Sequence, residues 1–254
     1  VRRDDGRPPS RRMSKARLDK LISDRTDLSR AEAKQAIRAG RVQAAGQVIR
    51  TPDARVDASL ALTLDQTPLR GDSELYILLH KPTGLLTAAR DSKAPTVMDL
   101  LPPLFVKRRC MPVGRLDKDT SGLLLLMTDG ELAHRLLSPK RGIEKLYEAQ
   151  VAGKLDAADV QAFAEGIALN DFTAKPADMR ILDANDETST AQVILTEGKH
   201  RQVRRMFASR GHEVLALKRL RFGPVGLDKD LPVGAYRELT DAEMRALKEA
   251  VDLG

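Results

Sequence analysis

The chain has 254 residues, of which 42% are hydrophobic, and a formal net charge of +7 at pH 7. This hydrophobic content is enough for a folded core in one or two domains and excludes a wholly disordered chain. The longest apolar run, residues 123–127, is far shorter than the roughly 20 residues of a membrane helix. The one cysteine, Cys110, excludes a disulfide framework, and the four histidines do not have zinc-ligand spacing. No apolar segment follows the basic N-terminus, so we expect no signal peptide and a soluble, cytoplasmic protein.

The N-terminal quarter of the sequence predicts an arm, a small domain and a linker. Residues 1–15 are polar, rich in Arg and Pro, and lack an apolar period, which predicts a flexible basic arm. Residues 16–64 form the small domain. Residues 65–74 contain Pro and Gly but no apolar cluster, so they are predicted to link it to a second domain, residues 75–254.

Within the small domain, apolar residues with helical spacing from Leu18 predict a short first helix. Ser29 and Glu32 have the spacing of a capping box, and Gly40 suits the position just after a helix end. These signals predict a second helix over residues 30–39. Short extended segments with a turn near Gly46 follow.

Strand-like and helix-like segments alternate irregularly in the second domain, which favours an α+β fold with a mixed sheet over a regular βαβ repeat. Strands are predicted at residues 75–80, 123–128, 146–151, 179–182, 191–195 and 213–221. Helices are predicted at residues 130–138, 156–165, 200–209 and 240–250.

Positive charge is concentrated in two segments. Residues 1–20 hold eight Lys or Arg against three Asp or Glu, and residues 199–221 hold eight against Glu213 alone. The rest of the chain has a net charge of −5, because 7 − 5 − 7 = −5. Such concentration favours a polyanionic partner, since each neutralised phosphate releases counterions.

The most unusual local sequence is GRLDKDTSGLLLLMTDG, residues 114–130, where a charged loop runs directly into an apolar strand. Asp117 is a candidate nucleophile or base, with Arg115 two residues before it, although a buried ion pair or a turn cap would use the same residue types. The spacing also resembles the start of a calcium loop, but its twelfth position is Thr128, where Glu is required. A Ser121–His134 nucleophile pair lacks the G-x-S-x-G elbow.

Four segments resemble the RsuA/RluB/RluE/RluF group of ribosomal RNA pseudouridine synthases, and they occur in that family's order. They are LLHKPTGLLTAARD (78–91), GRLDKDTSGLLLLMTDGELAHRLLSP (114–139), IEKLYEAQVAG (143–153) and EGKHRQVRRMFASRGHEVLALKRLRFGP (197–224). The N-terminal domain resembles the αL RNA-binding module of a ribosomal small-subunit protein. Together these similarities cover about residues 16–245.

The resemblance implies a reaction in which uridine is detached from its ribose and rejoined through carbon 5. Because no atom is gained, no redox cofactor or metal is implied. The resemblance assigns the catalytic carboxylate to Asp117, places Tyr147 against the flipped base, and makes Arg204 the partner that keeps Asp117 ionised. Arg115 is expected to fill the space that the base vacates.

The remaining expected contacts to RNA come from basic residues of both domains: Lys20, Arg30, Arg38, Arg41, Lys199, Arg201 and Arg205. We expect a monomer that acts on ribosomal RNA or on an assembling ribosomal subunit. Uridine 516 of 16S rRNA is the first expectation, since Lys-Pro-Thr-Gly is typical of RsuA-like members. Arg201 is instead typical of RluB-like members, so 23S rRNA is the alternative. A non-catalytic assembly factor is the hypothesis from a different class.

Overall fold

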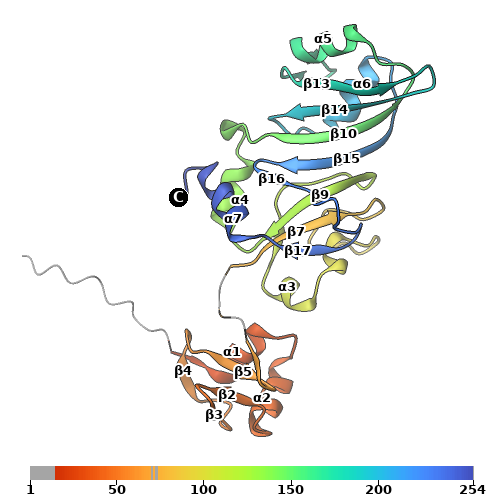
Figure 1. Ribbon diagram of the computed structural model, residues 1–254. Coiled ribbons are helices and arrows are strands. Elements are labelled where there is room, and N and C mark those ends of the chain that lie inside the picture. Colours follow the sequence, from red (N-terminus) through yellow and green to blue (C-terminus); the bar gives the residue numbers. More distant parts are fainter. Residues whose placement is uncertain (1–14, 70, 72–73, 254) are drawn as a thin grey trace, which may run out of the picture. The chain divides into compact units, whose positions relative to one another are not determined.

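The computed structural model describes residues 15–69, 71 and 74–253, so the predicted arm lies outside the described residues except for Lys15. The chain divides into two compact units (Figure 1). Unit 1 extends to residue 73 and includes residues 102–108, which carry the short helix α3 (Pro103–Lys107). Unit 2 comprises residues 74–101 and 109–254.

Unit 1 packs two helices, α1 (Leu18–Arg25) and α2 (Arg30–Arg38), with short strands. A four-stranded sheet has the order β3-β2-β5-β6, and β1 pairs with β4. The strands are β1 (Lys15–Arg17), β2 (Val42–Ala44), β3 (Gln47–Val48), β4 (Arg55–Asp57), β5 (Leu62–Leu64) and β6 (Thr67–Pro68). Strand β6 lies within the predicted linker, residues 65–74, and pairs with β5. The sheet of unit 1 therefore extends beyond residue 64, the predicted end of the small domain.

Both ends of α2 have the predicted chemistry. Ser29 accepts a hydrogen bond from the Glu32 backbone, and the Glu32 side chain accepts one from the Ser29 backbone, which confirms the capping box. At the other end Gly40 has φ +77°, and the Gly40 and Arg41 amides donate to the carbonyls of Ile37 and Ala36. Sequence-local hydrogen bonds therefore fix this helix.

Unit 2 is built on a mixed sheet with the strand order β13-β14-β10-β15-β9-β7-β17, and β8 and β16 pair with its inner strands. Among the described pairings of this sheet, β15 with β9 is parallel and the others are antiparallel. The strands are β7 (Tyr76–Lys81), β8 (Met111–Pro112), β9 (Thr120–Met127), β10 (Lys145–Ala152), β13 (Asp178–Ala184), β14 (Thr188–Leu195), β15 (Val214–Phe222), β16 (Val225–Gly226) and β17 (Tyr236–Glu238). A separate pair consists of β11 (Ile167–Ala168) and β12 (Thr173–Ala174).

All six predicted strands and all four predicted helices of unit 2 are present. The helices are α4 (Gly130–Leu137), α5 (Ala157–Glu165), α6 (Gln202–Ser209) and α7 (Asp241–Glu249). The 3₁₀ helices η1 (Val97–Leu100) and η2 (Pro139–Arg141) and the two- and three-residue strands of unit 2 were not predicted, because such short segments have no measurable periodicity. The expected α+β fold with a mixed sheet is confirmed.

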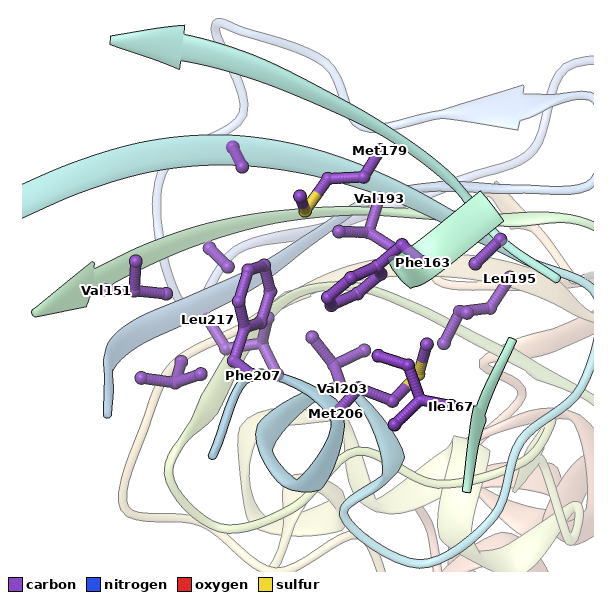
Figure 2. Close-up of a cluster of buried hydrophobic side chains, with 14 of the residues drawn as sticks. Val151, Phe163, Ile167, Met179, Val193, Leu195, Val203, Met206, Phe207 and Leu217 are labelled. Atoms are coloured by element: carbon purple, nitrogen blue, oxygen red, sulfur yellow. The ribbon is translucent and has the colours of Figure 1, made fainter. Parts of the chain in front are cut away.

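Clusters of buried apolar side chains stabilise unit 2. One packs α5 and α6 against β10, β13, β14 and β15, with Phe163 and Phe207 in tilted contact at 4.8 Å between ring centroids (Figure 2). Another packs Leu132, Leu136 and Leu247, from α4 and α7, with alternate residues of β7 and β9. The central strand β15 contributes to both clusters through Leu217 and Phe222, so the two halves of the sheet depend on it.

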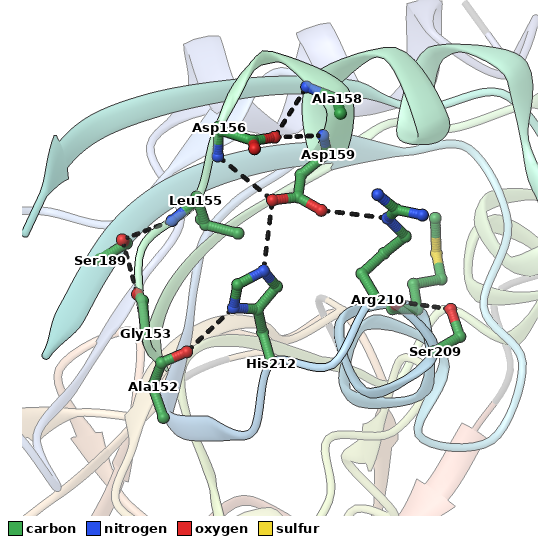
Figure 3. A network of polar contacts seen from close by, with 11 residues as sticks. Ala152, Gly153, Leu155, Asp156, Ala158, Asp159, Ser189, Ser209, Arg210 and His212 are labelled. Carbon is green, nitrogen blue, oxygen red and sulfur yellow. Dashed lines mark hydrogen bonds and ion pairs between the residues drawn. The ribbon is translucent and has the colours of Figure 1, made fainter. Parts of the chain in front are cut away.

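A buried carboxylate ties α5 to the segment after α6 (Figure 3). Asp159 is 4% exposed and accepts hydrogen bonds from Arg210 Nε at 3.0 Å and the Asp156 amide at 3.2 Å. Its other near neighbour is His212, whose Nε2 lies 3.2 Å from Oδ2 and whose Nδ1 lies 2.9 Å from the Ala152 carbonyl oxygen. This polar network fixes the end of α6 relative to β10.

Candidate active site

An open hollow of about 380 Å³ lies where the charged loop 114–119 meets the sheet and the start of α6. The loop contributes Arg115 and Asp117, and the segment before α6 contributes Lys199 and Arg201. Tyr147 of β10 and Leu217 of β15 also line it. Segments that the sequence analysis singled out separately therefore meet in one place.

The loop that carries Asp117 is braced by the segment 81–87. Thr87 Oγ1 donates to the Leu116 carbonyl at 2.8 Å and accepts from the Leu116 amide at 3.2 Å. The Gly84 amide donates to the Lys118 carbonyl at 2.7 Å. Backbone on both sides of Asp117 is thus fixed by the Thr87 side chain and the Gly84 main chain of the segment 81–87.

Lys81 completes this support from within the protein. Its side chain is fully buried, and Nζ donates to the carbonyls of Pro82, Asp117 and Thr120 at 2.9, 3.1 and 2.9 Å. Burial lowers the pKa of Lys81 to about 8, although the charges of Asp117 and Asp119 oppose the shift. All three donors of the ammonium group are therefore used, two of them on the carbonyls of Asp117 and Thr120 and one on the neighbouring Pro82 carbonyl.

The Asp117 carboxylate itself is half-buried and lines the hollow. Within the described residues it makes no hydrogen bond or ion pair, while its own carbonyl is held by Lys81. Tyr147, also half-buried, has no hydrogen-bond partner for its hydroxyl among the described residues. A carboxylate and a phenol with free polar atoms thus face one hollow, as reacting or substrate-binding groups do.

Arg204 differs from the sequence expectation, because it pairs with Asp119 and not with Asp117. Its Nη2 lies 2.9 Å from the Asp119 carbonyl oxygen and 3.3 Å from Oδ2, and Nη1 donates to the Val214 carbonyl at 2.9 Å. The Thr120 amide donates to the Asp117 carbonyl at 3.1 Å, which closes a turn there. Asp119, two residues into this turn, is the carboxylate that meets the first turn of α6.

Arg201 also pairs with Asp119, with both of its terminal nitrogens, at 3.2 and 3.0 Å. Burial raises the pKa of Asp119, but the hydrogen bond from Arg201 and the charge of Arg204 outweigh it and lower that pKa overall. Asp119 is therefore ionised and fastens the loop 114–119 to α6. Arg204 supports Asp117 indirectly, by binding the backbone carbonyl of Asp119 two residues further along the loop.

The sheet register places Tyr147 opposite Val193 of β14 and Arg219 of β15. A register shift between Leu146 and Tyr147 brings Arg219, rather than Leu220, to this position. On its other side Arg219 is the partner of Gly122 in β9. Tyr147 and the start of β9 are thereby separated by one strand.

The predicted RNA-contacting residues of unit 2 surround the hollow, with one exception. Arg115 is exposed and, like Lys199 and Arg201, lines it. Arg205 is not among the lining residues; it pairs with Asp171 and lies 5.1 Å from the centroid of the Phe172 ring.

In unit 1 the four predicted residues are all exposed but differ in their contacts. Arg30 pairs at 3.3 Å with the buried Asp19, and Arg41 pairs with Asp65. Lys20 and Arg38 have no side-chain ion pair within the described residues, so of the four they are the more available to phosphate.

The sequence analysis missed Lys81, Thr87 and Asp119 as supports of the site. The Lys-Pro-Thr-Gly segment was recognised, but its spacing did not reveal that a buried lysine would bind the Asp117 loop. A lysine at the end of an apolar strand was the available signal, because such a residue is rarely fully buried without a specific partner.

The family model described as RNA pseudouridylate synthase matches residues 75–209, more than half of the chain. The chain belongs to this family. A second family model, the S4 domain, matches residues 16–61. Both matches confirm the resemblance expected from the motifs, and the loop with Asp117 lies inside the pseudouridylate synthase match.

Individual members of the family are similar over nearly the whole chain. Ribosomal large subunit pseudouridine synthase B of Bacillus subtilis is 37% identical, covering 94% of this chain and 98% of the relative. Ribosomal small subunit pseudouridine synthase A of Haemophilus influenzae is 36% identical, covering 91% and 99%. A crystal structure of a pseudouridylate synthase aligns with a TM-score of 0.64 and 33% identity, covering 91% and 99%.

As a pseudouridylate synthase, the chain is an isomerase of uridine in RNA. None of the helices in the described residues is long and apolar enough to cross a membrane. Those residues also contain no group of three or more His, Cys, Asp or Glu side chains placed to hold a metal ion.

Proposed function

We propose that the protein converts one specific uridine of ribosomal RNA to pseudouridine, with Asp117 as the reacting carboxylate. The observation that carries the proposal is the Asp117 carboxylate, free of hydrogen bonds within the described residues and facing the same hollow as Tyr147. Fixed backbone around a free carboxylate is what a nucleophile or base requires. The named relatives that act on ribosomal subunits support the class of RNA.

In this mechanism the target base leaves its stack and enters the hollow, and Arg115 takes its place between the neighbouring bases. Asp117 attacks the anomeric carbon or removes a sugar proton, and the bond from that carbon to N1 breaks. The base turns and its carbon 5 bonds to the anomeric carbon, while the bond between Asp117 and that carbon breaks or the sugar proton returns from Asp117. The proton on carbon 5 then leaves, and N1 takes up a proton. Tyr147 holds the base and assists the loss of the proton from carbon 5.

Uridine 516 of 16S rRNA is the target that we propose first. The relatives include enzymes named for the small and for the large subunit at similar identity. A uridine of 23S rRNA is therefore the second candidate.

The test is carbodiimide mapping of pseudouridine by primer extension on 16S and 23S transcripts, incubated separately with the wild type and with Asp117→Asn. We expect a new stop in one RNA with the wild type and none with the variant, whose affinity for RNA stays within a few fold. Loss of activity together with affinity would assign Asp117 a structural role. Tight binding without a stop in either RNA would favour a non-catalytic assembly factor or a ribonucleoprotein substrate.

A further inference from the structure

A second hollow of about 360 Å³ adjoins the first and shares Arg115, Tyr147 and Lys199 with it. Its charged walls are Arg115, Lys145, Lys175, Lys199 and Arg219, with Glu197 as the one carboxylate among the described lining residues. No step of the proposed isomerisation uses Lys145 or Arg219. The proposed isomerisation therefore does not account for the excess of positive charge in this second hollow.

Arg219 is the most unusual member of this wall. Its side chain is 2% exposed, and Nε donates to the Leu123 carbonyl at 2.8 Å. Among the described residues the guanidinium makes no other hydrogen bond and no ion pair, and Nη2 is buried without a partner. Its Cζ lies 5.2 Å from the centroid of the Phe222 ring. A buried cation without a counter-ion is costly, so such groups are normally paired.

Lys145 lies on the same sheet face as Arg219, because Lys145 and Tyr147 are two residues apart on β10 and Tyr147 is opposite Arg219. Its Nζ has one described hydrogen bond, to the Ile143 carbonyl at 2.8 Å. Burial, followed by the charge of Arg219, lowers the pKa of Lys145 to about 8, against the opposing charge of Glu197. Two cations thus stand close together without a carboxylate between them.

Glu197 forms no ion pair with Lys145 or Arg219 within the described residues. Its Oε1 accepts from the Lys175 amide at 2.8 Å and from Gln202 Nε2 at 2.6 Å. Those bonds hold the segment before α6, and the single charge of Glu197 offsets only part of the positive charge of the hollow.

We propose that the second hollow binds a phosphate group of the RNA backbone, next to the nucleotide whose base enters the first hollow. Lys145 contacts the phosphate oxygens. The buried, positively charged guanidinium of Arg219 attracts the phosphate electrostatically from the wall of the hollow. Phosphate is the anion that RNA supplies, and the shared Tyr147 and Arg115 place it within one nucleotide of the reacting base. The inference rests on the proposed function for the identity of the chain that carries the phosphate.

The first test titrates inorganic phosphate into the full-length protein at constant ionic strength and follows the Arg219 Nε–H and the Lys145 and Arg219 amides by NMR. We expect saturable shifts at millimolar phosphate, at least tenfold weaker binding with Lys145→Gln, and unchanged binding with Lys154→Gln. Lys154 is an exposed cation that lines neither hollow. Absence of saturable shifts in the wild type, or equal affinity in Lys145→Gln, would overturn the proposal without reliance on the folding of any variant.

The second test distinguishes RNA phosphate from free phosphate. The dependence of binding on salt is measured with 16S and 23S transcripts, and Lys145→Gln is expected to reduce the slope of log K against log[salt] by roughly 0.7–0.9, the value for one phosphate contact. An unchanged slope, with phosphate still bound in the NMR titration, would refute the RNA assignment. Pseudouridine formed by a wild type that shows no phosphate shifts would refute this inference alone, and shifts without pseudouridine in either the transcripts or assembling ribosomal subunits would refute the proposed function alone.

Discussion

Asp117 is held in place by residues that never touch the hollow. Lys81 binds the Asp117 carbonyl, Thr87 binds Leu116 on both backbone groups, and Arg204 binds the Asp119 carbonyl. The side chain that remains free is the carboxylate. Rigid support beneath a free reactive group is the arrangement that reduces the entropy lost on reaching the transition state.

Replacement of Lys81 by Met should therefore impair catalysis more than binding. The change leaves three carbonyls without their donor and loosens the loop, and a misplacement near 1 Å costs roughly 100-fold in rate. We expect the single-turnover rate to fall about 10- to 100-fold while the RNA dissociation constant changes less than threefold. Lys118→Met, an exposed neighbour, is the matched control. Equal rates in the wild type and Lys81→Met would show that the loop needs no such support.

Asp19 is a buried carboxylate of unit 1 whose protonation should affect stability. It is fully buried, and a hydrogen bond from Arg17 lowers its pKa to about 2 against the opposing effect of burial, with a further contribution from Arg30. A carboxyl with a lowered folded-state pKa stabilises the fold above its unfolded pKa, and that stabilisation is lost as pH falls toward the folded value.

Unit 1 of the wild type should consequently lose stability between about pH 4 and pH 2, as Asp19 takes up a proton. Asp19→Asn should be less stable at pH 7 and should lack this part of the pH dependence. Hydrogen exchange of α1 and α2 amides measures it, with Asp24→Asn, exposed on the same helix, as control. The same acid-induced loss in both variants would refute the assignment to Asp19.

At the scale of single side chains, the sequence predicted the residues of the hollow better than their pairing. Asp117 and Tyr147 line one hollow, whereas Arg204 pairs with Asp119 and not with the predicted Asp117. Motif spacing does not determine which of two carboxylates in a short turn meets a helix 85 residues away. That choice depends on side-chain direction within the turn, which tertiary contacts fix.

Strands and helices were predictable wherever a long apolar period or a cap determined them. The capping boxes before α2 and α7 occur as Ser29 with Glu32 and Thr240 with Glu243. Strand order was not predictable, because β15 lies between β10 and β9 by long-range pairing that no local pattern encodes. The register shift beside Tyr147 was not predictable either, because it also depends on pairing between strands that are distant in the sequence.

The contact between β9 and β15 depends on the absence of a side chain at Gly122. That residue has φ +108°, and a Cβ there would lie 2.3 Å from the Arg219 carbonyl oxygen. Gly122→Ala should destabilise unit 2 by about 2–5 kcal/mol, from backbone strain and overpacking together. Gly130→Ala, where the added methyl meets nothing within 4 Å, should be neutral or stabilising. Urea unfolding measures both, and equal midpoints would contradict the role of Gly122.

At the scale of the whole molecule, positive charge on both units is expected to act on one RNA. Lys20 and Arg38 are exposed cations of unit 1, while Arg30 and Arg41 are partly neutralised by Asp19 and Asp65. Exposed cations without partners contribute most to counterion release.

The double variant Lys20→Gln/Arg38→Gln should therefore reduce the salt slope of rRNA binding by roughly 1.4–1.8, the value for two phosphate contacts. Filter binding between 50 and 300 mM salt gives the slope, because counterion release dominates the salt dependence of binding in about this range. Lys154→Gln/Lys229→Gln, which removes two exposed cations of unit 2 that line neither hollow, is the control. Equal slopes in the two double variants would show that unit 1 does not contact the RNA.

The central place of β15 has a consequence for biosynthesis. Strands β7 and β9, with the Asp117 loop, are made early, and β10 with Tyr147 follows, yet within the sheet the two halves are joined through β15. While residues 214–222 are still inside the ribosome, the nascent chain lacks β15, the strand that brings Asp117 and Tyr147 together. Because non-local pairing forms last, Asp117 and Tyr147 can come together only after residues 214–222 have left the ribosome.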